Sequence, residues 1–141
     1  MEIRIFRDPK KRFNIELPDE HENLKLFLEE EVQGIPYSCR DILNLIDSVV
    51  SETEEVGVWG GDSHLVSIYP ETTIIEVFFS SRNPENPILE EISTEEFRQV
   101  IAECLEFGIQ QGWDRTEEQI RADWDAYQLS KSLRTQNDSS T

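Results

Sequence analysis

Apolar residues alternate with polar ones in two short segments at the start of the chain. The segments 1–6 and 12–17 each place an aliphatic or aromatic residue at every second position, which is typical of half-buried strands. Asp8 and Pro9 between them supply a turn. The pattern predicts an opening β-hairpin.

The period then changes to that of a helix. Apolar residues follow helical spacing in the segments 19–33 and 38–51, and each pattern predicts one helix. Gly34 and Pro36 separate the two helices. Ser38, with an acidic residue three positions later, is the expected N-cap of the second helix.

From residue 56 the period returns to two. It predicts three consecutive antiparallel strands up to residue 79, separated by a Gly-Gly-Asp turn at 60–62 and a Pro-Glu turn at 70–71. Both faces of the third strand carry apolar groups, so we expect a central strand that helices cover on at least one side. The segment 88–92 predicts a further short strand.

The last third of the chain is helical by the same criteria. Ser93 and Glu96 form a capping-box pattern before a predicted helix at 94–111, which Gly112 closes. A final helix is predicted over 116–133. It presents an apolar stripe at Ile120, Trp124 and Tyr127.

Together these elements predict one α+β domain over residues 1–133, followed by a disordered polar tail at 134–141. In that domain a small antiparallel or mixed sheet of about five to six strands packs against about three to four helices. A length of 141 residues fits one domain. No secretory signal is visible, and no apolar run reaches the ~20 residues that span a bilayer. We therefore expect a cytoplasmic protein without membrane contact.

The charge is uneven along the chain. The formal net charge is −17. Residues 13–111 hold four basic and 22 acidic side chains, a net charge of −18, so this central segment accounts for the whole excess. Such a field repels nucleic acid and raises the on-rate of a basic partner by ~10–1,000-fold at low salt. Solubility alone is the alternative explanation, although a magnitude of about 2–8 suffices for that purpose. A basic partner and a solubility role both stay open.

Catalytic patterns are weak. Ser63 beside His64, or Cys39 or Cys104 with a distant histidine, are the only candidates for nucleophilic chemistry, and no known catalytic motif flanks them. Two cysteines without a CxxC pattern predict buried reduced thiols. Acidic residues are so many that some pair at a glycosidase distance is expected by chance. We predict neither an enzyme nor a metal or other cofactor.

One basic cluster exists, at residues 10–12 beside Arg7. It lies in a predicted turn without an aromatic platform, and it faces a strongly acidic body. A solvated turn explains it better than nucleic-acid binding does.

Large aromatic side chains surrounded by acidic residues are common at protein interfaces. Trp59 and Tyr69 lie in or beside the predicted strands, although a core position is the alternative for Trp59. Carboxylates held on a rigid sheet can match a basic partner at little cost in entropy. The predicted partner-binding residues are Glu54, Glu55, Trp59, Asp62, Tyr69, Glu71, Glu76 and Glu85.

The segment 56–108 resembles immunity proteins of bacterial toxin systems of the contact-dependent or polymorphic type. The resemblance rests on the short strands in VGVWGGDSHLVSIYPETTIIEVFF followed by the capped helix in ISTEEFRQVIAECLEFG. It implies a protein that covers the active site of a cognate toxin, often a basic nuclease or deaminase. An adaptor module that docks through Ile120, Trp124 and Tyr127 is the rival hypothesis. Subfamily, toxin and oligomeric state stay open.

Overall fold

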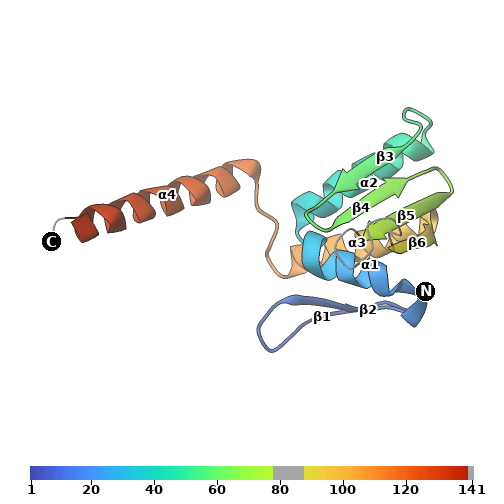
Figure 1. The fold of residues 1–141 in the computed structure, drawn as a ribbon, viewed down its shortest axis with the longest axis horizontal. Helices are drawn as coiled ribbons and strands as arrows, with labels where there is room; N and C mark the ends of the chain where they lie inside the picture. The colour runs from blue at the N-terminus through green and yellow to red at the C-terminus, as the bar shows by residue number, and fades with distance from the viewer. Residues whose placement is uncertain (78–87, 140–141) are drawn as a thin grey trace.

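The computed structural model describes residues 1–77 and 88–139 (Figure 1). The fold is α+β, as predicted from the sequence. The predicted end of the third sheet strand and Glu85 lie outside the described residues. In chain order the elements are β1 (Arg4–Arg7), β2 (Phe13–Glu16), η1 (Asp19–His21), α1 (Glu22–Phe27), the π-helical turn η2 (Leu28–Val32), α2 (Pro36–Val50), β3 (Gly57–Gly60), β4 (His64–Ile68), β5 (Thr72–Val77), β6 (Ile88–Ser93), α3 (Thr94–Gln110) and α4 (Glu117–Ser139).

The six described strands form two antiparallel sheets, whereas one sheet was predicted. β1 pairs with β2 in a two-stranded hairpin, with Ile5 opposite Ile15. The other four follow each other in the order β3-β4-β5-β6, with Val66 opposite Ile75 in its two central strands. Alternation alone predicts strands but not which strands share a ladder, so this part of the prediction was wrong.

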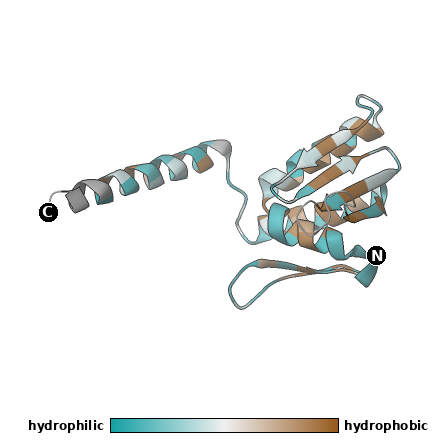
Figure 2. Cartoon of the chain, viewed as in Figure 1, coloured by the Kyte–Doolittle hydropathy of each residue, from teal (hydrophilic) through white to brown (hydrophobic). Residues whose placement is uncertain are grey.

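Helices cover one face of the four-stranded sheet, which we call the inner face. Along β4 and β5, every second side chain is buried in a single core, while the residues between them are only half-buried. α1 packs on β5 and β6, α2 on β3 and β4, and α3 on β5 and β6. Figure 2 shows the hydrophobic residues gathered in the strands and helices of this body. Phe27 and Phe97 are the largest fully buried side chains.

The two predicted helix starts had different outcomes. Ser93 caps α3 as predicted, because its Oγ accepts a hydrogen bond from the backbone N–H of Glu96 at 3.1 Å. Ser38 does not cap α2. That helix begins two residues earlier at Pro36, whose fixed φ suits the first helical position, and Ile35 is its N-cap without a side-chain bond.

α3 passes very close to the turn before α2. A Cβ added to Gly108 would lie 2.0 Å from the carbonyl oxygen of Gly34, a distance that no side chain tolerates. Gly34 itself has φ of +66°, which favours glycine. This close approach allows α2 and α3 to pack along each other over the core.

The predicted helix at 19–33 is broken into three turns of different type. η1, α1 and η2 follow each other, and Gln33 ends them in the left-handed region at φ 56°. The carboxylate of Glu90, on the inner face of β6, accepts hydrogen bonds from the backbone N–H groups of Asn23 at 3.0 Å and Leu24 at 3.4 Å. It also contacts Nδ1 of His21 at 3.3 Å. β6 therefore supplies the cap that the sequence around α1 lacks.

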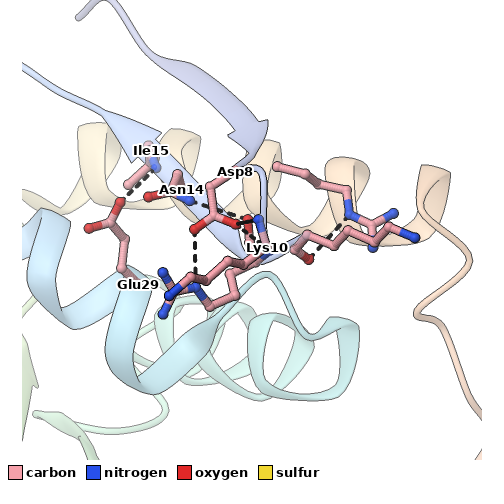
Figure 3. Close-up of polar contacts among 8 residues, drawn as sticks. Asp8, Lys10, Asn14, Ile15 and Glu29 are labelled. Carbon is pink, nitrogen blue, oxygen red and sulfur yellow. Dashed lines mark hydrogen bonds and ion pairs between the residues drawn. The ribbon is translucent and has the colours of Figure 1, made fainter.

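The opening hairpin is fixed by two carboxylates, which Figure 3 shows. Oδ1 of Asp8 accepts from the backbone N–H groups of Lys10 and Arg12, each at 2.9 Å. Chiefly because of the backbone hydrogen bond from Arg12, the pKa of Asp8 falls to about 2. Glu29 of η2 accepts from the backbone N–H of Ile15 at 3.0 Å, and this bond ties the hairpin to the helical side of the body.

α4 lies apart from the rest of the body (Figure 1). A reciprocal capping box begins it: Oγ1 of Thr116 accepts from the N–H of Gln119 at 3.1 Å, and Oε1 of Gln119 accepts from the N–H of Thr116 at 2.8 Å. None of its described side chains is buried, and none belongs to the core. The helix runs to Ser139, so the predicted tail is helical over 134–139. In the described part of the chain, no helix is long and apolar enough to cross a membrane.

Candidate functional site

No helix among the described residues packs on the second face of the four-stranded sheet, which we call the outer face. Along each strand, residues that point to the outer face alternate with residues that point to the inner face. The aliphatic centre of the outer face consists of Val58, Leu65, Ile74 and Leu89, with Ser67 between Val58 and Ile74 and with Glu76 between Leu65 and Leu89. Val58 and Leu89 are 53% and 57% exposed. Burial of an exposed aliphatic side chain of this size contributes ~1.5–3 kcal/mol, so this centre offers binding energy that the free chain does not use.

Carboxylates lie among these aliphatic side chains and at the end of the sheet. Glu76 of β5 and Glu91 of β6 lie on the outer face itself, where Glu76 is opposite both Leu65 and Leu89, and Glu91 is opposite Ile74. At one end of the sheet, Glu71 lies in the turn between β4 and β5. Exposed aliphatic side chains together with charged ones are common at protein-binding surfaces.

The turn that carries Tyr69 and Glu71 is held rigidly to the start of α3. Oγ1 of Thr94 donates a hydrogen bond to the carbonyl oxygen of Tyr69 at 2.6 Å and contacts Oγ1 of Thr73 at 2.9 Å. The backbone N–H of Thr94 donates to the carbonyl oxygen of Glu71 at 3.0 Å. Because Thr73 and Thr94 are buried, the turn keeps its conformation before any partner arrives.

The turn at the opposite end of the sheet is held by Glu31 of η2. Its carboxylate accepts hydrogen bonds from the backbone N–H groups of Asp62 at 3.1 Å and Ser63 at 2.8 Å, and from Oγ of Ser63 at 2.8 Å. Burial opposes ionisation of this carboxyl, but these bonds and the one from His64 outweigh it, and the pKa of Glu31 is lowered. Both ends of the sheet are thus fixed by polar contacts to the helical layer.

The structure brings half of the predicted binding residues together. Tyr69 and Glu71 share the β4–β5 turn, and Glu54 and Glu55 precede β3 at the same end of the sheet, because Gly57 is opposite Ile68. All four are exposed. They form an acidic end that continues from the outer face.

The other predicted binding residues lie elsewhere. Asp62 is at the opposite end of the sheet, and Glu76 is on the outer face. Trp59 is on the inner side: its ring packs edge-on against Phe27 at 5.5 Å between centroids, and its Nε1 donates to Asp41 at 3.1 Å. The core alternative for Trp59 therefore describes its position best.

The sequence reasoning missed the apolar residues of the outer face. Val58 and Leu89 each carried a signal, since they alternate with inward residues in their strands. This alternation identifies Val58 and Leu89 as surface residues only once the structure shows which side of the sheet the helices cover.

Ser63, His64 and Glu31 lie together, but their geometry differs from that of a nucleophilic triad. Nδ1 of His64 is 2.9 Å from Oγ of Ser63 and 3.2 Å from Glu31. A carboxylate only accepts, so Nδ1–H and the Ser63 hydroxyl both donate toward Glu31. The remaining nitrogen, Nε2, is buried without a hydrogen-bond partner. In a triad the serine would instead donate to a histidine nitrogen with a free lone pair.

The remaining chemical candidates are also explained by packing. Cys39 and Cys104 are free, buried thiols, and burial raises the pKa of Cys39 to about 12 and that of Cys104 well above its ordinary value. Such thiols are poor nucleophiles at neutral pH. Among the described residues no group of three His, Cys, Asp or Glu side chains could hold a metal ion.

The basic cluster lies in the β1–β2 turn as predicted. The Arg7 guanidinium lies over the ring of Trp113 at 5.5 Å, and Arg12 pairs with Asp8 at 3.0 Å. These two cations are therefore already engaged within the chain.

Comparisons with known proteins assign no family to this chain. No protein-family model matches this chain, and searches of curated proteins and of solved structures give no match either.

Proposed function

We propose that this chain is an acidic binding protein that neutralises a basic bacterial toxin domain, as an immunity protein does, by covering that domain with its outer sheet face. The observation that carries the proposal is the uncovered outer face, on which exposed aliphatic side chains lie among carboxylates: exposed Leu89 lies beside Glu76 of the neighbouring strand and Glu91 of its own strand. The formal net charge of −17 supports the choice of a basic partner.

The physical roles of the aliphatic centre and the carboxylates differ. The carboxylates attract a basic surface over a distance and mainly raise the association rate. Aliphatic side chains at the centre lose contact with water on binding and mainly slow dissociation. A rigid sheet with both end turns fixed by Thr94 and Glu31 brings these groups to the partner already ordered, which reduces the entropy cost of association.

The test is protection from a toxin in cells. If a toxin gene lies directly upstream of this gene, co-expression of the chain with that toxin domain should restore growth, and the purified pair should form a complex. Val58→Asp with Leu89→Asp should abolish both effects. Val50→Asp is the matched control, because Val50 is 50% exposed at the end of α2, away from the outer face. Full protection by the double variant would refute the proposal.

An adaptor that docks through α4 is the alternative function, and exposed Trp124 and Tyr127 favour it. A chain of residues 1–114 separates the two hypotheses. It should bind the toxin domain as tightly as the full chain if the outer face is the site. Loss of binding in this truncated chain would favour the adaptor.

A further inference from the structure

We propose that α4 is a dimerisation helix, which pairs antiparallel with α4 of a second copy of this chain. This proposal does not depend on the function of the outer sheet face. Three features of the helix support it: an exposed apolar stripe, the position of that stripe outside the core of the described residues, and a charge distribution that favours one orientation.

The apolar stripe runs along one side of α4. Ile120, Trp124 and Tyr127 follow the i, i+4, i+7 spacing of a single helix face. They are 44%, 59% and 54% exposed, and the rings of Trp124 and Tyr127 lie 5.8 Å apart between centroids. Two adjacent large aromatic side chains of this kind are typical of interface centres.

Ile120 lines a pocket with Ile35, Tyr37 and Trp113 at the base of the helix, and beyond it the described residues provide no cover for α4. The helix begins at its own capping box, Thr116 with Gln119, and projects from the body for 23 residues (Figure 1), a length of about 34 Å. Helices in proteins gain most of their stability from packing of an apolar face. α4 lacks such packing in the described structure, so a second helix would supply it.

Charge along the helix selects the orientation. Residues 117–125 hold four acidic side chains and one basic one, a net charge of −3, whereas residues 126–139 hold two basic side chains and one acidic one, a net charge of +1. A parallel pair would place like charges together at both ends. An antiparallel pair places the acidic half of each helix along the basic half of the other, and this arrangement is attractive.

The linker allows this pairing without disturbing the body. Arg40 holds Asp114 in a bidentate ion pair at 2.6 and 2.8 Å, and the ring of Trp113 packs edge-on against Phe107. The base of α4 is thus fixed on α2 and α3, while its distal part stands clear of the body. Two bodies can therefore lie at opposite ends of the helix pair.

Sedimentation of the full chain over a range of micromolar concentrations tests the proposal. The wild-type chain should sediment as a dimer, and Trp124→Glu with Tyr127→Glu should halve its mass. Leu89→Glu is the matched control, since it removes an equally exposed apolar residue from the outer face and should remain dimeric. A wild-type chain that is monomeric throughout would overturn the proposal. A double variant that still dimerises would also overturn it.

Cysteine cross-linking tests the orientation. In the antiparallel register that packs Trp124 of one helix against Tyr127 of the other, Arg121 of one helix lies beside Gln128 of the other. Arg121→Cys mixed with Gln128→Cys should therefore form an interchain disulfide readily. Neither variant should do so alone, because in an antiparallel pair the two copies of one new cysteine do not face each other. The native thiols of Cys39 and Cys104 do not compete, because they are buried. Cross-linking of either variant alone at the rate seen in the mixture would overturn the antiparallel arrangement. Unchanged circular dichroism of each variant confirms that the body is folded.

Discussion

The carboxylate of Glu31 lies 3.2 Å from Nδ1 of His64 and joins the π-helical turn η2 to the β3–β4 turn. A second glutamate–histidine contact, between Glu90 and His21, joins β6 to the start of α1. Here the glutamate is on the sheet and the histidine is on the helical segment. Both histidines of the chain thus lie where the segment 19–33 meets the sheet. This irregular segment is fastened at its two ends by buried or half-buried carboxylates, and it separates the hairpin from the main sheet.

Replacement of Glu31 by Gln should destabilise the fold. An amide keeps an acceptor oxygen but has no negative charge, and it places an NH₂ group against donors of Asp62, Ser63 and His64. Loss of a charged hydrogen-bond acceptor from such a site costs about 1–3 kcal/mol. Urea unfolding should show this loss, while Glu30→Gln, at an exposed position of the same turn, should change the free energy of unfolding by less than about 0.5 kcal/mol. Equal effects of the two substitutions would contradict the role of Glu31.

The same carboxylate should make stability depend on acid pH. The pKa of Glu31 is lowered in the folded chain, so its contribution is fully present above its unfolded pKa of about 4.3. It is then lost as the pH falls through the lower folded value. The difference in unfolding free energy between wild type and Glu31→Gln should be constant from neutral pH down to about pH 5 and should shrink below about 4.3. A difference that does not change with pH would show that Glu31 is not ionised in the fold.

Gly108→Ala should disrupt the packing of α3 on the turn before α2. The new Cβ would meet the carbonyl oxygen of Gly34 at 2.0 Å, and backbone atoms cannot move aside as a flexible side chain does. We expect a loss of about 1–3 kcal/mol in unfolding free energy, although alanine is the better helix former. Gly60→Ala is the control, because its Cβ would meet only the Leu65 side chain at 3.4 Å. Unchanged stability of Gly108→Ala would mean that the two segments can separate at no cost.

Deletion of α4 should have little effect on the stability of the body. A helix with Trp124 and Tyr127 first suggests a packed element, but the structure leaves both side chains exposed and outside the core. A chain of residues 1–114 keeps the ion pair between Arg40 and Asp114 and should melt within a few degrees of the full chain, at a protein concentration low enough to keep the full chain monomeric. A large drop in melting temperature would indicate contacts of α4 with the body in solution.

Local patterns predicted the elements well, and long-range contacts explain what they missed. The Ser93–Glu96 cap was predicted correctly because both residues belong to one helical turn. The bond between Glu31 and Ser63 joins residues 32 positions apart, and no local pattern reports it. The hairpin and the other four described strands do not pair with each other, and alternation within a strand does not report which strands stay apart.

The candidate site was predicted in part for the same reason. Acidic residues in turns can be recognised in a sequence, and Glu71 and Tyr69 do share one exposed turn. Which face of a strand lies open depends on where the helices pack. The alternation of apolar and polar residues in a strand with apolar groups on both faces does not say which face the helices cover. Trp59 was assigned to the binding residues, yet it lies against Phe27 on the covered side. Val58, its neighbour, points to the open side and was missed.

Charge reversal on the outer face should slow association with a basic partner. Glu71 lies in the β4–β5 turn at one end of the outer face, and Glu76 lies on β5 between Leu65 and Leu89, so both add to the field that a partner meets as it approaches. Glu71→Lys with Glu76→Lys should lower the association rate by roughly tenfold at low salt and flatten its dependence on salt, because steering by exposed charges is screened within a Debye length. Dissociation should change less.

The control for this variant must change the net charge equally. Glu30→Lys with Glu106→Lys does so at exposed positions of η2 and α3, on the side of the sheet away from the outer face. If steering came from total charge alone, the two double variants would slow association by the same factor. If the outer face is the docking site, the Glu71 and Glu76 variant should be markedly slower, because charges near the contact act over the shortest distance. Stopped-flow association kinetics at several salt concentrations distinguish these results, and equal rates would place the interface elsewhere on the molecule.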